Sequence, residues 1–171
     1  QDFPRHYIDM TTGFDAYLAR FSGKTRSTLR RKTRKLVSEN GGTLEVRSFH
    51  RAEESKAFFS DALPLSARTY QDRLLDAGLP GDALFRAETE RLAGQDALRA
   101  WVLYLAGRPA AYLYLPVIGD TVRYDFLGYD PARASLSPGT VLQMHALDEL
   151  MAEDRFRWFD FTSGDGAHKR L

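Results

Sequence analysis

The chain has 171 residues, of which 43% are hydrophobic and 27% are charged. This composition is typical of a globular protein, and the length predicts one domain over residues 1–171 with a sizeable core. The formal net charge of +1 gives no overall tendency to bind nucleic acid or membranes. The absence of cysteine excludes disulfides, thiolate metal sites and a cysteine nucleophile.

Targeting signals are not evident in the sequence. No apolar run is long enough to span a bilayer, and the opening residues QDFPRHYIDM lack the pattern of a signal peptide. Together with the lack of cysteine, this favours a cytoplasmic protein. Because the chain does not begin with methionine, we expect it to be an excised segment or a processed form.

The first half of the chain is predicted to be mainly helical. Apolar spacing and stop signals at glycine and proline define its elements. Pro64 is expected to end one helix. The expected elements are an edge strand at 3–8, helices at 14–21 and 24–40, a strand at 43–49, and helices at 51–63, 65–77 and 82–93.

The helix at 24–40 is strongly basic, with no acidic residue between Asp15 and Glu39. The residues Arg26, Arg30 and Arg34 recur at a spacing of four and are predicted to form one stripe. Such a run is either a solvated face or a surface for a phosphate-bearing partner. Aromatic residues are not interleaved with the cations, which disfavours stacking on single-stranded bases.

In the second half the apolar period changes from helical to strand-like. Three runs at 98–105, 110–118 and 122–129 are separated by short turns and predict an antiparallel meander. A helix at 138–153 and a strand at 156–162 follow, and that last strand is expected to pair in parallel with a neighbour. This order predicts a single α/β or α+β domain with a mixed sheet.

Two features of this second half indicate a site. The step Ser137-Pro138-Gly139 begins the helix at 138–153, and the free N–H groups of a helix start bind anions. Asp125 lies in the middle of the strand at 122–129, where carboxylates are disfavoured. The alternative for Ser137 is a helix N-cap with Pro138 in the first helical position.

Six segments, which together span residues 24–169, resemble those of a known family in this order. They resemble the cellulose-biosynthesis-type branch of the GNAT acetyltransferases, which is related to the Fem-type peptidyl transferases. The resemblance implies a GNAT-like mixed, mainly antiparallel sheet flanked by helices. That fold usually ends with a further hairpin, so an incomplete C-terminal part is expected. The segments are KTRSTLRRKTRKL, SARTYQDRLL, AGRPAAYLYL, YDFLGYD, SPGTVLQMHALDEL and WFDFTSGDGAHK.

The resemblance implies transfer of an acyl group from acetyl-CoA or another acyl-CoA to an amine or hydroxyl of a polar acceptor. An amino sugar of polysaccharide biosynthesis or an amino-acid derivative would be such an acceptor. The CoA pyrophosphate would lie at Ser137, Gly139, Thr140 and Val141, although the loop lacks the family's usual Gln/Arg-x-x-Gly-x-Gly/Ala pattern. The alternatives are a Fem-type aminoacyl or peptidyl transferase with an RNA-linked donor, and a non-catalytic binding module.

The resemblance also suggests roles at the reacting centre. Acyl transfer needs a base, an oxyanion site and a group that protonates the leaving thiolate. Asp125 is the candidate base, and an ion pair with Arg123 is its alternative. His168 is the candidate proton donor, and an exposed tail histidine is the alternative. The oxyanion donors would be the backbone N–H groups of Leu127, Gly128 and Tyr129.

Further residues are assigned to the acceptor and to phosphates. Arg68 and Tyr70 are expected to line the acceptor pocket, Asp160 to orient substrate or to cap a loop, and Lys169 to accompany His168. The basic run 24–35 would bind a nucleotide- or lipid-linked sugar, the CoA 3′-phosphate or RNA. His145 has no second ligand at metal spacing, so no metal site is predicted.

Overall fold

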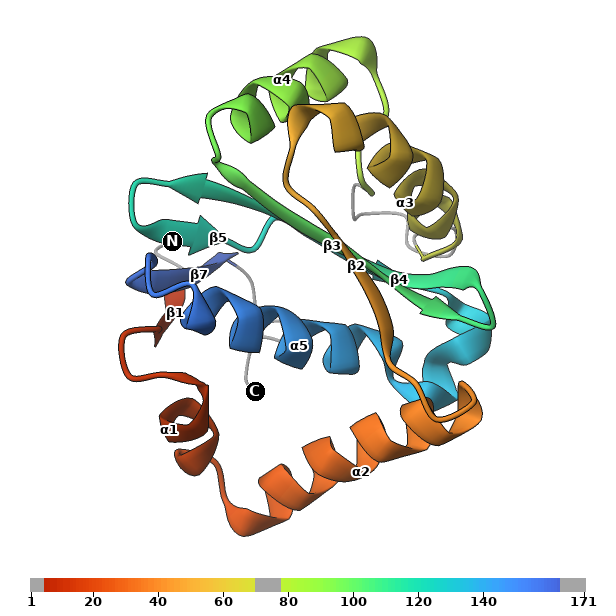
Figure 1. Ribbon diagram of the computed structural model, residues 1–171, viewed down its shortest axis with the longest axis vertical. Coiled ribbons are helices and arrows are strands. Elements are labelled where there is room, and N and C mark those ends of the chain that lie inside the picture. The colour runs from red at the N-terminus through yellow and green to blue at the C-terminus, as the bar shows by residue number, and fades with distance from the viewer. Residues whose placement is uncertain (1–4, 70–77, 164–171) are drawn as a thin grey trace.

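The computed structural model describes residues 5–69 and 78–163, which form a seven-stranded mixed sheet (Figure 1). The strand order is β1-β7-β5-β4-β3-β2, and β6 also pairs with β4. Every pair is antiparallel except β5–β7, which is parallel. The strands are β1 Arg5–Asp9, β2 Glu45–Phe49, β3 Leu98–Leu105, β4 Arg108–Ile118, β5 Thr121–Arg123, β6 Phe126–Tyr129 and β7 Trp158–Ser163.

Helices cover both faces of this sheet. Figure 1 shows α3 and α4 on one side, and α5, with α1 and α2 beyond it, on the other. None of the helices in the described ranges combines the length and apolar character that a bilayer crossing requires. The helices are α1 Phe14–Ala19, α2 Gly23–Glu39, α3 Ser55–Thr69, α4 Ala83–Gly94 and α5 Pro138–Ala152, with 3₁₀ turns η1 Ala52–Glu54 and η2 Pro131–Leu136.

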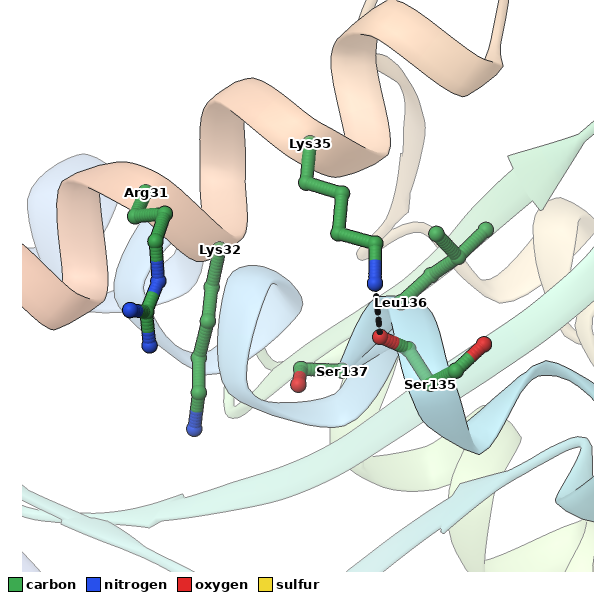
Figure 2. Close-up of a pocket in the computed structure, with 6 residues that line it drawn as sticks. All are labelled: Arg31, Lys32, Lys35, Ser135, Leu136 and Ser137. Carbon is green, nitrogen blue, oxygen red and sulfur yellow. Dashed lines mark hydrogen bonds between the residues drawn. The ribbon is translucent and has the colours of Figure 1, made fainter.

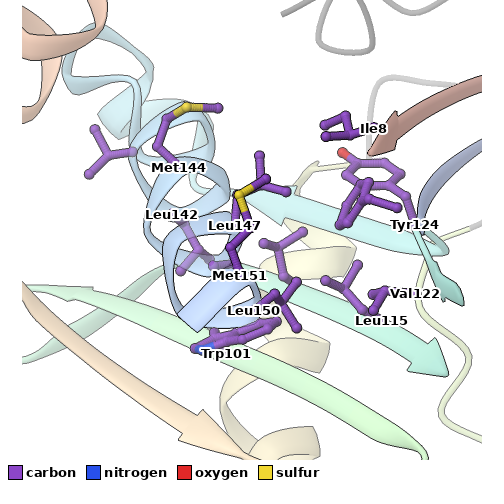
Figure 3. Close-up of a cluster of buried hydrophobic side chains, with 14 of the residues drawn as sticks. Ile8, Trp101, Leu115, Val122, Tyr124, Leu142, Met144, Leu147, Leu150 and Met151 are labelled. Carbon is purple, nitrogen blue, oxygen red and sulfur yellow. The ribbon is translucent and has the colours of Figure 1, made fainter. Parts of the chain in front are cut away.

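The central strands are buried on both faces because each face has its own helical cover. Along β3, Trp101 and Leu103 belong to the cluster on the α5 side, whereas Ala100 and Val102 belong to the cluster on the α3 side. Figure 3 shows the α5-side cluster, in which Trp101 lies with Leu150 between α5 and the sheet. This double burial explains why the meander reads as nearly continuous apolar runs.

The prediction that Pro64 ends a helix is wrong, because α3 continues through it to Thr69. Pro64 is exposed, whereas its neighbours Ala62 and Leu65 are fully buried with Phe58. The packing of this face outweighs the loss of one N–H and the steric cost of the ring. The predicted helix at 65–77 is therefore a continuation of α3 as far as residue 69, and residues 70–77 lie outside the described part.

The predicted single strand at 122–129 is also wrong, because it is divided into β5 and β6. Val117 pairs with Val122 and Tyr114 pairs with Phe126, so residues 115–116 of β4 lie opposite residues 123–125. One extra residue on one strand of an antiparallel pair is a β-bulge, which bends the strand that carries it. The bulge places Asp125 at the point where β6 leaves the line of β5.

Gly128 is predicted to be essential for stability, because a side chain there has no space. A Cβ at this position would overlap the ring of Tyr112, which is fully buried in β4. We expect Gly128→Ala to lower the free energy of unfolding by about 2 to 3 kcal/mol through overpacking. Urea denaturation measures this loss. The matched control is Gly139→Ala, whose Cβ would meet its nearest neighbour, Leu127 Cδ2, at an ordinary 3.4 Å. Equal stability of Gly128→Ala and the wild type would contradict the packing argument.

Candidate functional site

The divergence of β6 from β7 defines the centre of the candidate site. Residues 121–123 pair in parallel with residues 158–160, and the Tyr124 N–H donates to the Asp160 carbonyl at 2.8 Å. This confirms the predicted parallel pairing of the last strand. Beyond residue 124, the described part of β7 has no register with β6, which pairs with β4 alone. The edge of β6 opposite β4 is therefore not covered by a strand of the described sheet.

Asp125 lies at this divergence and forms a two-point ion pair with Arg123. Arg123 Nε is 2.5 Å from Asp125 Oδ1, and Nη2 is 2.8 Å from Oδ2. The hydrogen bonds that Arg123 donates to the Asp125 carboxylate raise the pKa of Arg123. The structure thus contains the ion pair that was the alternative to a base role. An ionised carboxylate held in this way can only accept hydrogen bonds or protons.

The three predicted oxyanion donors differ in orientation. The Asp130 N–H donates to the Ala110 carbonyl, and ladder bonds recur at every second residue, so the Gly128 N–H also faces β4. The N–H groups of Leu127 and Tyr129 point away from β4. The Tyr129 N–H donates to Thr69 Oγ1 at 3.0 Å, and the Thr69 hydroxyl lies 2.6 Å from the Tyr129 carbonyl oxygen. Thr69 was not identified from the sequence, which gives no signal for this contact between α3 and β6.

The start of α5 has Ser137 and Pro138 in the predicted positions, but it lacks a side-chain cap. Ser137 occupies the N-cap position, but its φ of 51° and ψ of 49° are left-handed and its side chain makes no capping hydrogen bond. The first helical bond runs from the Val141 N–H to the Ser137 carbonyl at 3.1 Å. The N–H groups of Gly139 and Thr140 precede that bond and have no intrahelical acceptor. The helix start therefore keeps the donors that an anion requires.

A basic cavity of about 300 Å³ lies beside this helix start (Figure 2). Its cations come from α2, and Figure 2 shows them extending toward the loop that carries Ser135 and Ser137. Lys35 Nζ donates to the Ser135 carbonyl at 3.3 Å. The structure thus brings together the basic helix and the Ser-Pro-Gly step, which were separate predictions. The lining residues are Arg31, Lys32, Lys35, Ser135, Leu136 and Ser137.

The three arginines of the predicted stripe all lie on α2, but their contacts differ. Arg26 donates to the carbonyls of Ala19 and Phe21, at 3.3 and 2.9 Å, and so holds the segment that follows α1. Arg30 and Arg34 are exposed and do not line the cavity. Leu29 and Leu36 of the same helix are buried in the α5-side cluster. The helix therefore presents two separate basic surfaces, one toward the cavity and one toward solvent.

The remaining predicted site residues are only partly described. Asp160 is buried, and its Oδ1 accepts the N–H of Thr162 in the same strand, β7, at 2.8 Å. Arg68 is exposed at the end of α3. His145 pairs with Glu149 at 2.8 Å on α5, and the described residues contain no group of three or more His, Cys, Asp or Glu arranged to hold a metal. Tyr70, His168 and Lys169 lie outside the described residues.

Comparison with known proteins gives a family and a fold. Residues 23–170 match the family described as Acetyltransferase (GNAT) domain. None of the curated protein sequences matches this chain significantly.

Solved structures with a similar fold include FemX, which is 12% identical with a TM-score of 0.67 over 97% of this chain and 55% of that one. L-PGS from Bacillus licheniformis is 15% identical with a TM-score of 0.61 over 95% of this chain and 46% of that one. An aminoglycoside acetyltransferase from an uncultured soil metagenomic sample, in complex with sisomicin, is 14% identical with a TM-score of 0.53. The match covers 74% of this chain and 81% of that one.

At identities this low, the structural similarity shows the fold alone. It confirms the predicted mixed, mainly antiparallel sheet flanked by helices. The chain spans about half the length of FemX and L-PGS.

Proposed function

We propose that this chain, which belongs to the family of GNAT acetyltransferase domains, transfers an acyl group from an acyl-CoA to a polar acceptor. Acetyl-CoA is the simplest donor. The acceptor would offer an amine or a hydroxyl, as an amino sugar or an amino-acid derivative does. The observation that carries the proposal is the basic cavity at the uncapped start of α5, beside the strand that diverges from β7.

The charges of CoA match this arrangement. CoA carries a pyrophosphate and a 3′-phosphate. The N–H groups of Gly139 and Thr140 at the α5 start would bind the pyrophosphate with Ser137 and Val141 as neighbours. Arg31, Lys32 and Lys35 would neutralise the remaining phosphate charge across the cavity. The loop has a single glycine, Gly139, and so offers few close backbone contacts to a phosphate. The cations of α2 would compensate for this.

The proposed reaction is attack of the acceptor nitrogen or oxygen on the thioester carbonyl. The C–S bond then breaks, and the CoA thiolate takes up a proton. Asp125 would accept the proton that the acceptor loses, and an N–H of β6 directed away from β4 would stabilise the oxyanion. We assign proton donation to His168, and we assign contact with the acceptor to Arg68, Tyr70, Asp160 and Lys169.

Calorimetric titration with acetyl-CoA and CoA tests the donor. We expect both to bind the wild-type chain, and we expect Gly139→Asp to weaken both by about tenfold, because its carboxylate would compete with the phosphates at the helix start. Gly139→Ala is the control for volume, and circular dichroism checks the fold. A folded wild-type chain that binds neither ligand would refute an acyl-CoA donor.

A second candidate is a Fem-type aminoacyl or peptidyl transferase with an RNA-linked donor. It is favoured by the exposed Arg30 and Arg34, which do not line the cavity, and by a fold similarity to FemX that extends over 97% of this chain. Phosphate contacts by these residues would make tRNA binding fall steeply with added salt. Absent or salt-insensitive tRNA binding would exclude this candidate.

A further inference from the structure

Gln143 is a buried residue whose amide nitrogen has no hydrogen-bond partner in the described part of the chain. It lies in the second turn of α5 and is 2% exposed. Its Nε2 makes no hydrogen bond within residues 5–69 and 78–163. The other buried polar side chains of the described chain each have a partner: Ser55 with Glu90, Ser66 with Leu79, Thr89 with Tyr114, Arg99 with Glu153, and Asp160 with Thr162.

The position of Gln143 on α5 places it toward β6. Gly139 is one turn earlier on the same face, and a Cβ at Gly139 would contact Leu127 Cδ2 of β6 at 3.4 Å and Tyr129 Cδ1 at 3.7 Å. Further along this face, Ala146 and Leu150 are fully buried against the sheet. Gln143 therefore lies between the anion-binding start of α5 and the middle of the core, on the face that packs against β4 and β6.

This position is occupied by an amide where packing alone would favour an apolar residue. Its neighbours on the face are Gly139, Ala146 and Leu150, none of which offers a side-chain acceptor. A buried polar group without a partner destabilises the fold, so native structures seldom contain one without a functional reason. The missing partner must be a hydrogen-bond acceptor that reaches the interior beside β6.

We propose that Gln143 donates a hydrogen bond to a carbonyl oxygen of the pantetheine arm of the acyl-CoA. This inference rests on the proposed function. With the phosphates at the α5 start, the arm would run from Gly139 along the edge of β6 toward Asp125 at the bulge. The arm carries two amide carbonyls and the thioester carbonyl, and each is an acceptor of the kind that the buried amide lacks. Gln143 is thus a residue that positions the arm.

The test is Gln143→Met, which keeps the length of the side chain and removes its hydrogen-bonding groups. We expect acetyl-CoA and CoA to bind about tenfold more weakly. We expect adenosine 3′,5′-bisphosphate, which lacks the arm, to bind as it does to the wild type. The unliganded variant should also be more stable toward urea, because an unpaired buried amide has been removed. Leu150→Met, on the same face, is the control and should alter neither affinity.

The results separate the two levels of inference. If the wild type binds acetyl-CoA and Gln143→Met binds it equally well, the role of Gln143 is refuted and the proposed function stands. An equal loss of affinity for acetyl-CoA and for the bisphosphate would also refute it, because the site as a whole would then be disturbed. A folded wild type that binds none of these ligands would refute the proposed function itself. A loss for acetyl-CoA but not CoA would assign the bond to the thioester carbonyl.

Discussion

Asp125→Asn is expected to lower kcat by a factor of about one hundred or more while acetyl-CoA binding stays unchanged. General base catalysis contributes factors of this size, and asparagine has almost the same shape but cannot accept the proton. The site of Asp125 supports the role, because the bulge places its carboxylate where β6 leaves β7. Steady-state kinetics with an amine found by acceptor screening measures kcat, and calorimetry measures binding.

The ion pair with Arg123 provides the matched control. If Asp125 serves only to hold Arg123, then Arg123→Met should reduce kcat as much as Asp125→Asn does. If Asp125 is the base, Arg123→Met leaves the carboxylate in place and should retain most of the rate. A value of kcat for Asp125→Asn equal to that of the wild type would remove the base assignment.

Reversing the charge of the cavity is expected to weaken acetyl-CoA binding by about one hundredfold. The double variant Arg31→Glu/Lys35→Glu replaces two cations that line the cavity with anions, and each lost phosphate contact is worth about tenfold. Because Lys35 makes only an exposed hydrogen bond to the Ser135 carbonyl, the fold should be unaffected. Calorimetric titration measures the affinity, and urea denaturation checks the stability.

The control uses the other basic surface of the same helix. Arg30→Glu/Arg34→Glu changes the net charge equally and has the same spacing, but neither residue lines the cavity. We expect it to change acetyl-CoA affinity by no more than about twofold, since exposed charges at a distance are screened by salt. Equal losses of acetyl-CoA affinity in the two double variants would show that the overall positive charge of α2 attracts the ligand, and not the cations of the cavity. A selective loss of tRNA binding in the control variant would favour the RNA-linked donor.

Elements with strong local patterns could be predicted from the sequence. The strand at 98–105 was predicted with the bounds of β3, because glycine-rich turns and a long apolar run define it. The prediction that Pro64 ends a helix failed because the burial of its neighbours decides whether the helix continues. That burial depends on tertiary packing, which the local sequence does not show. The bulge at 123–125 was missed because the sequence gives the apolar alternation but not the register against β4.

The site was predicted as separate parts. The start of α5 and the basic helix were both identified as candidate sites, but Lys35 and Ser135 are one hundred positions apart, and no local pattern indicates that they meet. Ser137 takes the expected N-cap position with Pro138 after it, but its side chain makes no capping hydrogen bond, and its backbone is left-handed where η2 ends. Gln143 carried no signal, since a glutamine in a helix is ordinary until its burial is known.

The pairing of β1 with β7 has a consequence for the order of folding. Ile8 lies opposite Phe159, so the first and last described strands complete one edge of the sheet together. At translation rates of 5–20 residues per second, roughly 8 to 30 seconds would pass between the synthesis of these two segments. During that interval the β1 segment has no partner strand, and closing so long a loop is entropically the most costly pairing in the sheet. The meander β3–β4–β5–β6 would therefore assemble first, and the parallel strand and its edge partner would join last.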